Sequence, residues 1–253
     1  MNQHTVPLSD HAHAIILGSL LGDGSLRMHK GYANARFSFR HSETQKEYFL
    51  WKAQALKEIS KSGTHTVQKA DGYSKNLKLM FQSQALPCLT ELYQYTHKRS
   101  THLKIQRRWL NKMTALSLAI WWFDDGSLIA NSRKGVFCTD GFDQDSVKVL
   151  ARYFEKVWDI HTHVAPIGRK RDGKQDEYWR LWIRSTSELQ KFLRIILPYV
   201  PSPSMLTKVL LLYKDRHLQE RWISEVEEKT HFSKEIIEKA LSEKRMKWKN
   251  FRE

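Results

Sequence analysis

Two acidic residues stand at matching places in the sequence and are the strongest candidates for chemistry. Residues 16–26 read ILGSLLGDGSL and residues 118–128 read LAIWWFDDGSL, so Asp23 and Asp125 each follow an apolar run and precede Gly-Ser-Leu. Such runs predict helices that end at the Asp-Gly pair, where Gly24 and Gly126 supply the usual stop. A carboxylate there meets the negative end of the helix dipole, which costs roughly 0.3–1 kcal/mol. We therefore expect a cation beside each acid, although an Asx-type turn would explain a single Asp-Gly pair.

The chemistry open to these acids depends on whether they meet. If the two apolar helices pack across a pseudo-twofold axis, Asp23 and Asp125 arrive side by side, and Gly18, Ser19 and Gly22 permit a close approach. Carboxylates that hold one or more hard metal ions can activate water and neutralise charge during phosphodiester hydrolysis.

The elements that would position the acids repeat with an offset near one hundred residues. After each Asp-Gly-Ser-Leu come a hairpin, an amphipathic helix, a second strand pair and a short closing helix. Period-two alternation marks the strands: Phe37 and Phe39 alternate with polar residues, as do Leu181 and Ile183. The expected fold class is α+β, with two pseudo-symmetric αββαββα lobes that form a saddle of antiparallel β-ribbons and pack their motif helices at the lobe interface. The expected domains are 1–104, 105–213 and a charged helical extension at 214–253.

Composition limits the partners. The chain has 253 residues with 42 Lys plus Arg against 27 Asp plus Glu, a net charge of +15, and a pI near 9.7. Such an excess attracts polyanions. The 41% hydrophobic content excludes a disordered basic tail, and two cysteines are too few for a disulfide scaffold. We expect a soluble intracellular protein without a membrane span or secretory signal, in a bacterial cytoplasm or in the matrix of a mitochondrion or chloroplast.

At these residues the chain resembles a known family. ILGSLLGDG at 16–24 and LAIWWFDDG at 118–126 look like the two motifs of a single-chain LAGLIDADG homing endonuclease. The wider match includes MTALSLAIWWFDDGSL and PYVPSPSMLTK, which are similar to the type encoded in group I introns. The resemblance covers about residues 10 to 213. The second motif departs from the small-residue pattern at Ile120 and Trp121-Trp122, which bears on how tightly the helices cross.

The resemblance implies roles for individual residues. Asp23 and Asp125 become the metal-binding catalytic acids, and the residues before them, Gly22 and Asp124, are secondary metal ligands. The resemblance also implies one basic residue near the metal in each lobe. This residue would be Lys104 in the first lobe and Lys208 in the second. The alternatives to Lys104 are His102, Arg107 and Arg108. The implied cofactor is Mg²⁺, with Mn²⁺ able to substitute and Ca²⁺ binding without supporting cleavage.

A basic, polar face of the ribbons is the expected surface for double-stranded DNA, because a β-ribbon fits the major groove. The tip of the last hairpin, at residues 169–174, is expected to bind DNA phosphates rather than to read bases. The expected DNA-binding residues are Arg27, His29, Asn34, Arg36, Ser38, Arg40, Lys75, Asn76, Lys78, Asn131, Arg133, Lys134, Arg169, Lys170, Arg171, Lys174, Arg180, Trp182 and Arg184.

Two further features stay open at this point. The pairs His11/His13 and His161/His163 have no third ligand at metal-binding spacing, so we interpret them as polar-face residues or phosphate contacts. Residues 214–253 carry eleven basic and nine acidic side chains. They are either a helical appendage on the second lobe or an accessory DNA-contacting arm, suggested by Lys244, Arg245, Lys247, Trp248 and Lys249.

The expected function is a monomeric, metal-dependent endodeoxyribonuclease that makes a double-strand break in a long asymmetric target and so promotes intron or intein-like mobility. The alternative is an RNA-binding group I intron maturase, with intron RNA as its partner and with or without residual DNA cleavage. A regulator on the same scaffold that has lost cleavage is disfavoured, because both Asp23 and Asp125 are retained.

Overall fold

The structure, a computed structural model, describes residues 7–69, 77–97, 102–129, 132–171 and 174–247. The chain divides into two compact units, Met1–Trp121 and Trp122–Glu253. None of the described helices is long and apolar enough to span a membrane.

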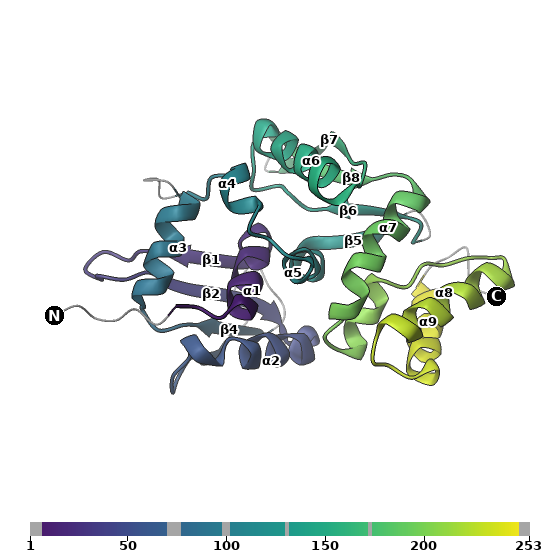
Figure 1. The fold of residues 1–253 in the computed structure, drawn as a ribbon, viewed down its shortest axis with the longest axis horizontal. Helices are drawn as coiled ribbons and strands as arrows, with labels where there is room; N and C mark the ends of the chain where they lie inside the picture. Colours follow the sequence, from purple (N-terminus) through teal and green to yellow (C-terminus); the bar gives the residue numbers. More distant parts are fainter. Residues whose placement is uncertain (1–6, 70–76, 98–101, 130–131, 172–173, 248–253) are drawn as a thin grey trace. The chain divides into compact units, whose positions relative to one another are not determined.

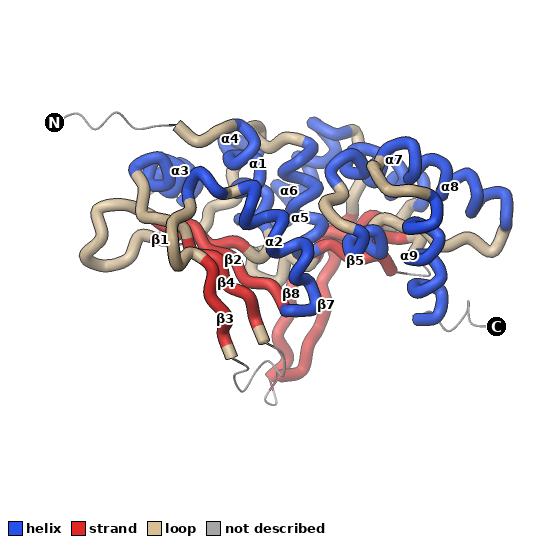
Figure 2. Tube along the Cα trace, turned by 90° about the horizontal axis from the view of Figure 1, so that it is seen from below, coloured by secondary structure: helices blue, strands red, loops and turns tan. Residues whose placement is uncertain are grey.

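The first unit contains a four-stranded antiparallel sheet with the order β1-β2-β4-β3. Figure 1 labels β1, β2 and β4 of this sheet. The helices of the unit cover one face of that sheet (Figure 2). In chain order its elements are α1 (Asp10–Leu21), β1 (Gly24–Arg27), β2 (Arg36–Ser42), α2 (Lys46–Ala55), β3 (His65–Gln68), β4 (Lys78–Gln82), α3 (Pro87–His97) and α4 (Arg107–Leu110), with 3₁₀ turns η1 (Glu43–Gln45) and η2 (Lys57–Ile59) on either side of α2.

The second unit repeats this arrangement with the sheet order β5-β6-β8-β7. Helix α5 (Ala115–Asp125) begins in the first unit and ends in the second. It is followed by β5 (Gly126–Ile129), β6 (Lys134–Phe137), α6 (Gln144–Trp158), β7 (His163–Arg171), β8 (Lys174–Ile183), α7 (Thr186–Ile196), the 3₁₀ turns η3 (Leu197–Tyr199) and η4 (Pro203–Lys208), α8 (Arg216–Lys229) and α9 (Lys234–Lys247). The predicted α+β class and the repeated αββαββα order are confirmed.

Alternation along the strands builds each core. In β2, Phe37, Phe39 and His41 are buried, while Arg36, Ser38 and Arg40 lie on the other face. Apolar residues on every second position cover one face of a sheet, and helices then shield that face from water. In the second unit the rings of Phe137, Phe154 and Phe192 pack at centroid distances of 5.5–6.0 Å.

The glycines after the two motif acids have a role besides the predicted helix stop. Helix α5 ends at Asp125, directly before Gly126 as predicted, whereas α1 ends at Leu21, before the Asp-Gly pair. Gly24 and Gly126 are the first residues of β1 and β5. A Cβ at Gly24 would lie 2.6 Å from the Ser19 side chain, and one at Gly126 would lie 2.1 Å from the Trp122 ring. Each glycine is needed because the strand leaves its helix in close contact with the helix itself.

Helix α1 approaches the first part of α5 closely within the first unit. A Cβ at Gly18 would lie 2.3 Å from the carbonyl oxygen of Ser117 and 2.9 Å from the Cβ of Ile120. The small residue on α1 therefore permits the approach even though Ile120, on α5, is large.

Candidate metal centre and nucleic-acid interface

Asp23 lies between the end of α1 and the start of β1. Ser9 caps the N-terminus of α1, and the helix ends at Leu21 with Gly22 as its C-cap. The strand that begins at Gly24 holds the next residues in the sheet, so the acid is fixed at a junction between two regular elements. Its side chain is 39% exposed, which leaves carboxylate oxygens accessible to a ligand.

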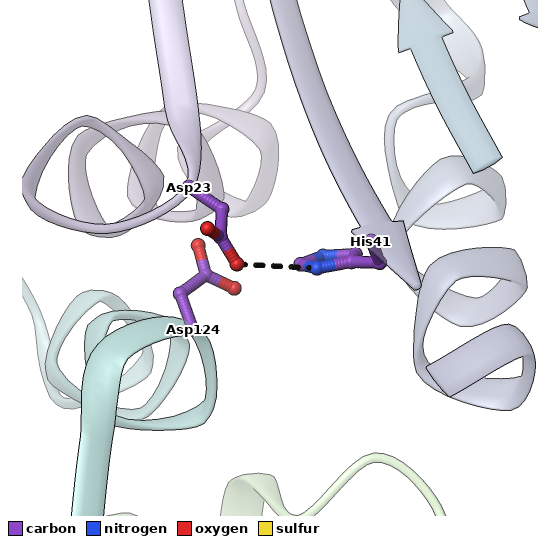
Figure 3. A group of neighbouring side chains, drawn as sticks. All are labelled: Asp23, His41 and Asp124. Carbon is purple, nitrogen blue, oxygen red and sulfur yellow. Dashed lines mark ion pairs between the residues drawn. The ribbon is translucent and has the colours of Figure 1, made fainter. Parts of the chain in front are cut away.

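His41 faces this acid from strand β2 (Figure 3). Its Nδ1 lies 3.2 Å from Oδ2 of Asp23, and its side chain is fully buried. The imidazole packs against the rings of Phe39 and Tyr48 at centroid distances of 5.3 and 4.9 Å. The aromatic surroundings fix the ring, and the ring in turn restricts the orientation of the carboxylate.

The sequence reasoning missed His41, although a signal for it was present. Alternation through Phe37 and Phe39 places His41 on the core face. A polar side chain at a core position of a strand requires a partner. Lys52 of α2 was missed as well: it is fully buried, and its Nζ lies 4.6 Å from the centroid of the Phe39 ring.

The second unit carries the other acids at the end of α5. Asp124 is 8% exposed and leaves the last turn of the helix (Figure 3), and Asp125 is half-buried. The backbone N–H of Cys138 donates to the carbonyl oxygen of Asp125 at 3.2 Å, which ties the helix end to the strand region after β6. Carboxylate oxygens suit a hard divalent cation, so the donor atoms in both units fit the implied metal.

Lys208 lies at the C-terminal end of α5. Its Nζ donates to the carbonyl oxygens of Phe123 at 2.6 Å and Asp124 at 3.3 Å. The carbonyl oxygen of Lys208 accepts a hydrogen bond from Nε1 of Trp122 at 2.9 Å. The ammonium therefore sits against the negative end of the helix dipole, beside the acids, where a cation is stabilising.

Lys104 has a different setting in the first unit. Its side chain is exposed, its N–H donates to the carbonyl oxygen of Thr96, and its own carbonyl oxygen accepts from Nε1 of Trp109 at 2.6 Å. These contacts hold the main chain at Lys104 and leave its ammonium toward solvent. Of its two arginine alternatives, Arg107 donates to Asn111, and Arg108 lies over the Tyr95 ring.

The expected DNA-binding residues of the first unit lie mainly on one face of its sheet. Arg36, Ser38 and Arg40 project opposite to the buried side chains of β2, and the register places Arg27 of β1 directly across from Arg36. The guanidinium of Arg36 also lies 4.6 Å from the centroid of the Tyr32 ring. His29 is exposed, and Asn34 and Lys78 are half-buried.

In the second unit, Arg180 of β8 is paired with an acid. Its Nε and one terminal nitrogen donate to the two carboxylate oxygens of Asp140 at 2.6 and 2.7 Å. The hydrogen bond to Asp140 raises the pKa of Arg180, and the charge of Asp125 adds to that rise. Arg133, Lys134 and Arg184 are exposed, and Trp182 is half-buried.

Several expected residues fall outside this description. Lys75, Asn76, Asn131, Trp248 and Lys249 lie outside the described residues. Arg169, Lys170, Arg171 and Lys174 belong to β7 and β8 by their backbone, and their side chains are outside the described part of the chain.

Comparison with known proteins identifies the class. The profile of the LAGLIDADG DNA endonuclease family matches residues 13–192, so the chain belongs to that family, and the resemblance predicted from the two motifs is confirmed. The fold is similar to that of the homing endonuclease I-WcaI bound to its DNA recognition sequence, with a TM-score of 0.68 and 18% identity over 82% of this chain and 89% of that one.

The chain is also similar in sequence to proteins with two different names. The chain is 28% identical over 222 residues to Protein RecA of Mycobacterium shimoidei. This match covers 83% of the chain and 48% of the relative. It is 26% identical over 218 residues to cytochrome b mRNA maturase bI2 of Saccharomyces cerevisiae, covering 83% and 49%. The chain thus spans about half the length of these relatives.

Proposed function

We propose that this protein is a site-specific, divalent-metal-dependent DNA endonuclease that makes a double-strand break in a long asymmetric target and so promotes the mobility of its own coding element. The observation that carries the proposal is the duplicated fold with an acid at the same junction in each unit: Asp23 before β1 and Asp125 before β5. Membership of the endonuclease family supports the same conclusion.

In this proposal Asp23 and Asp125 bind Mg²⁺, with Gly22 and Asp124 as secondary ligands. A bound divalent ion supplies an activated water and neutralises negative charge on the phosphodiester. His41 orients the carboxylate of Asp23 through the contact between Nδ1 and Oδ2. Lys208 places a positive charge at the end of α5, where it can stabilise negative charge that develops on the phosphate.

The proposed DNA-binding surface is the face of each sheet away from the helices. In the first unit, the opposed pair Arg27 and Arg36 places two like charges directly across neighbouring strands. Such a pair is destabilising in a free sheet, and a DNA phosphate or a guanine edge would relieve it. The bidentate pair with Asp140 indicates that Arg180 is less available for DNA than the exposed Arg40 and Arg184.

A second candidate function is that of an RNA-binding intron maturase. The similarity to cytochrome b mRNA maturase bI2 favours it, and the same basic faces could bind folded RNA through its phosphates. The two functions are compatible in one chain, because cleavage needs the acids and RNA binding does not.

The test joins the DNA that flanks this reading frame into the uninterrupted allele and incubates it with purified protein and Mg²⁺ or EDTA. We expect a discrete double-strand cut that needs the metal. The variants Asp23→Asn and Asp125→Asn should each lower the cleavage rate by two or more orders of magnitude, as expected for loss of a group that acts in the transition state, while DNA binding is largely kept.

The matched control is Asp10→Asn, an exposed acid in the first turn of α1, the helix that precedes Asp23. It should cleave at the wild-type rate. Tight, salt-sensitive binding without a cut, combined with faster splicing of the intron RNA, would replace the nuclease with the maturase.

A further inference from the structure

Lys244 of α9 is a buried lysine whose ammonium is directed at main-chain carbonyls. It is 5% exposed, and its Nζ donates to the carbonyl oxygens of Thr207 at 2.5 Å and Leu210 at 2.6 Å. Thr207 and Leu210 flank Lys208. The contacts show that this part of 214–253 packs on the second unit, and that Lys244 is not available as a DNA-contacting arm.

Two side chains of α8 bind the same segment. Nε1 of Trp222 donates to the carbonyl oxygen of Val209 at 3.2 Å, and Nε2 of Gln219 donates to that of Leu211 at 3.1 Å. Together with Lys244, α8 and α9 therefore satisfy four carbonyls between residues 207 and 211.

The fifth carbonyl of this segment is that of Lys208, which accepts from Trp122 of α5. Main-chain carbonyls normally bond to other main-chain groups, and side-chain donors replace them where a segment has no regular structure. The last helical residue of η4 is Lys208. Side chains of α5 on one side, and of α8 and α9 on the other, therefore hold the main chain of residues 207–211. Because this main chain is held, the direction of the Lys208 ammonium is fixed.

We propose that α8 and α9 form a clamp that positions Lys208 against the end of α5, with Lys244 as its principal positioning residue. The proposal rests on the proposed endonuclease function, in which Lys208 acts beside the acids. It assigns a role to helices that lie outside the residues matched by the family profile, 13–192.

The choice of a lysine supports a positioning role over a purely stabilising one. Moving an ammonium from water into a protein interior is costly, and an apolar side chain of similar length would avoid that cost. Burial lowers the pKa of Lys244 to about 7, which reflects the same penalty. This cost is offset by two short hydrogen bonds from Nζ of Lys244 to the carbonyl oxygens of Thr207 and Leu210, which lie on either side of Lys208.

The test measures single-turnover cleavage of the joined-flank DNA by Lys244→Met, Lys208→Met and the double variant. Lys244→Met keeps an unbranched side chain that is one atom shorter, and it removes the hydrogen bonds to both carbonyl oxygens. Because a small displacement of a catalytic group is costly, we expect cleavage to slow by about 10- to 100-fold, with DNA affinity unchanged. If Lys244 acts through Lys208, the double variant cleaves as slowly as Lys208→Met alone. Independent, multiplicative losses would overturn the proposal.

The matched control is Lys239→Met, an exposed lysine on the same helix, which should retain the wild-type rate. If Lys244→Met does not fold, Trp222→Phe takes its place in the same cycle. It keeps an aromatic ring, although a smaller one, in the buried site and removes the donor to the carbonyl oxygen of Val209. A wild-type rate for the folded clamp variant would overturn the clamp.

A second measurement needs no cleavage and separates this proposal from the nuclease itself. Acetylation of the free protein with an activated ester, followed by mass spectrometry, reports how accessible the Lys208 amine is. We expect the rate at Lys208 to rise in Lys244→Met and to stay unchanged in Lys239→Met. An unchanged rate at Lys208 in Lys244→Met contradicts the clamp whether or not the protein cuts DNA.

Discussion

At the scale of single residues, the contact between His41 and Asp23 distinguishes the first unit from the second. The two units share their register, with Gly24 opposite Phe39 and Gly126 opposite Phe137. The residue of the second unit that corresponds to His41 is therefore Thr139, whose hydroxyl donates to the carbonyl oxygen of Trp179 at 2.6 Å. Only the first acid has an imidazole at this position, so we expect the two acids to differ in how strongly they hold a metal.

A substitution at His41 tests its role as the group that orients Asp23. We expect His41→Leu to lower metal affinity and cleavage by about 10- to 100-fold. His41→Asn should recover part of this loss, because its amide can reach the position of Nδ1. The measurement is the Mg²⁺ dependence of the cleavage rate. The control is His11→Leu, which replaces an exposed histidine of α1. Equal cleavage rates for His41→Leu and wild type would contradict the role of His41 in orienting Asp23.

Single residues also show where the sequence was informative. The positions of Asp23 and Asp125, each directly before a strand that follows an apolar helix, could be predicted because the same motif occurs in two repeats. Their metal-binding role stays a prediction. His41 and Lys244 could not be assigned with equal ease, because their roles depend on partners far along the chain, and the spacing of residues does not report such partners. The hydrogen bonds from Lys208 to α5 join residues more than eighty positions apart.

At the scale of elements, the close approach of α1 to α5 depends on one glycine. Gly18→Ala gains helix propensity of about 1 kcal/mol, but its Cβ would meet the Ser117 carbonyl and the Cβ of Ile120. Overpacking against backbone typically costs about 1–3 kcal/mol, and a separation of 2.3 Å places this site at the upper end. We therefore expect a net loss in the free energy of unfolding, measured with urea.

Gly141→Ala is the control for this substitution. Nothing lies within 4 Å of a Cβ built at Gly141, so its effect should stay within about 0.5 kcal/mol. A Gly18→Ala variant as stable as wild type would mean that the two helices separate without loss.

Strand β2 provides the test of the DNA-binding face. Arg40 is exposed and lies opposite to the buried face of the strand. We expect Arg40→Ala to weaken DNA binding and to reduce the slope of log affinity against log salt by about one if it contacts a phosphate. The control is Lys46→Ala, an exposed lysine of α2, and binding isotherms at several salt concentrations distinguish the two.

The order of the elements could be predicted from the sequence more fully than their details. Alternation of Phe37 and Phe39 with polar residues gave the correct face of β2. The same alternation of apolar and polar residues continues back to Ala33, but β2 begins at Arg36 and Ala33 is exposed. Alternation extends into turns without a physical requirement there, because strand ends are decided by hydrogen bonds to the neighbouring strand.

At the scale of the whole molecule, the buried lysine predicts how stability depends on pH. The pKa of Lys244 is about 7 in the folded protein, below the ordinary value of about 10.4 in an unfolded chain. Between these values the unfolded chain binds one more proton, so the free energy of unfolding should rise with pH by up to about 1.4 kcal/mol per pH unit. Below pH 7 this contribution is absent.

Urea unfolding at several pH values measures this dependence. The difference in stability between wild type and Lys244→Met should change with pH above about 7 and stay constant below it, because the variant lacks the titrating group. Comparing the two proteins cancels the titration of all other groups. A pH-independent difference would mean that Lys244 keeps its ordinary pKa when folded.

The division of the chain between Trp121 and Trp122 falls inside a continuous helix, α5. One residue inserted near this point would turn the helical residues after it by about 100° about the helix axis. The position of Asp125 around the axis of α5 would then change relative to Ser117 and Ile120 of the same helix. Exchange of halves between related genes should therefore succeed only when the crossover lies before Ala115 or keeps the length of α5 unchanged. In the design of chimeric proteins, the number of residues in α5 therefore matters as much as their identity.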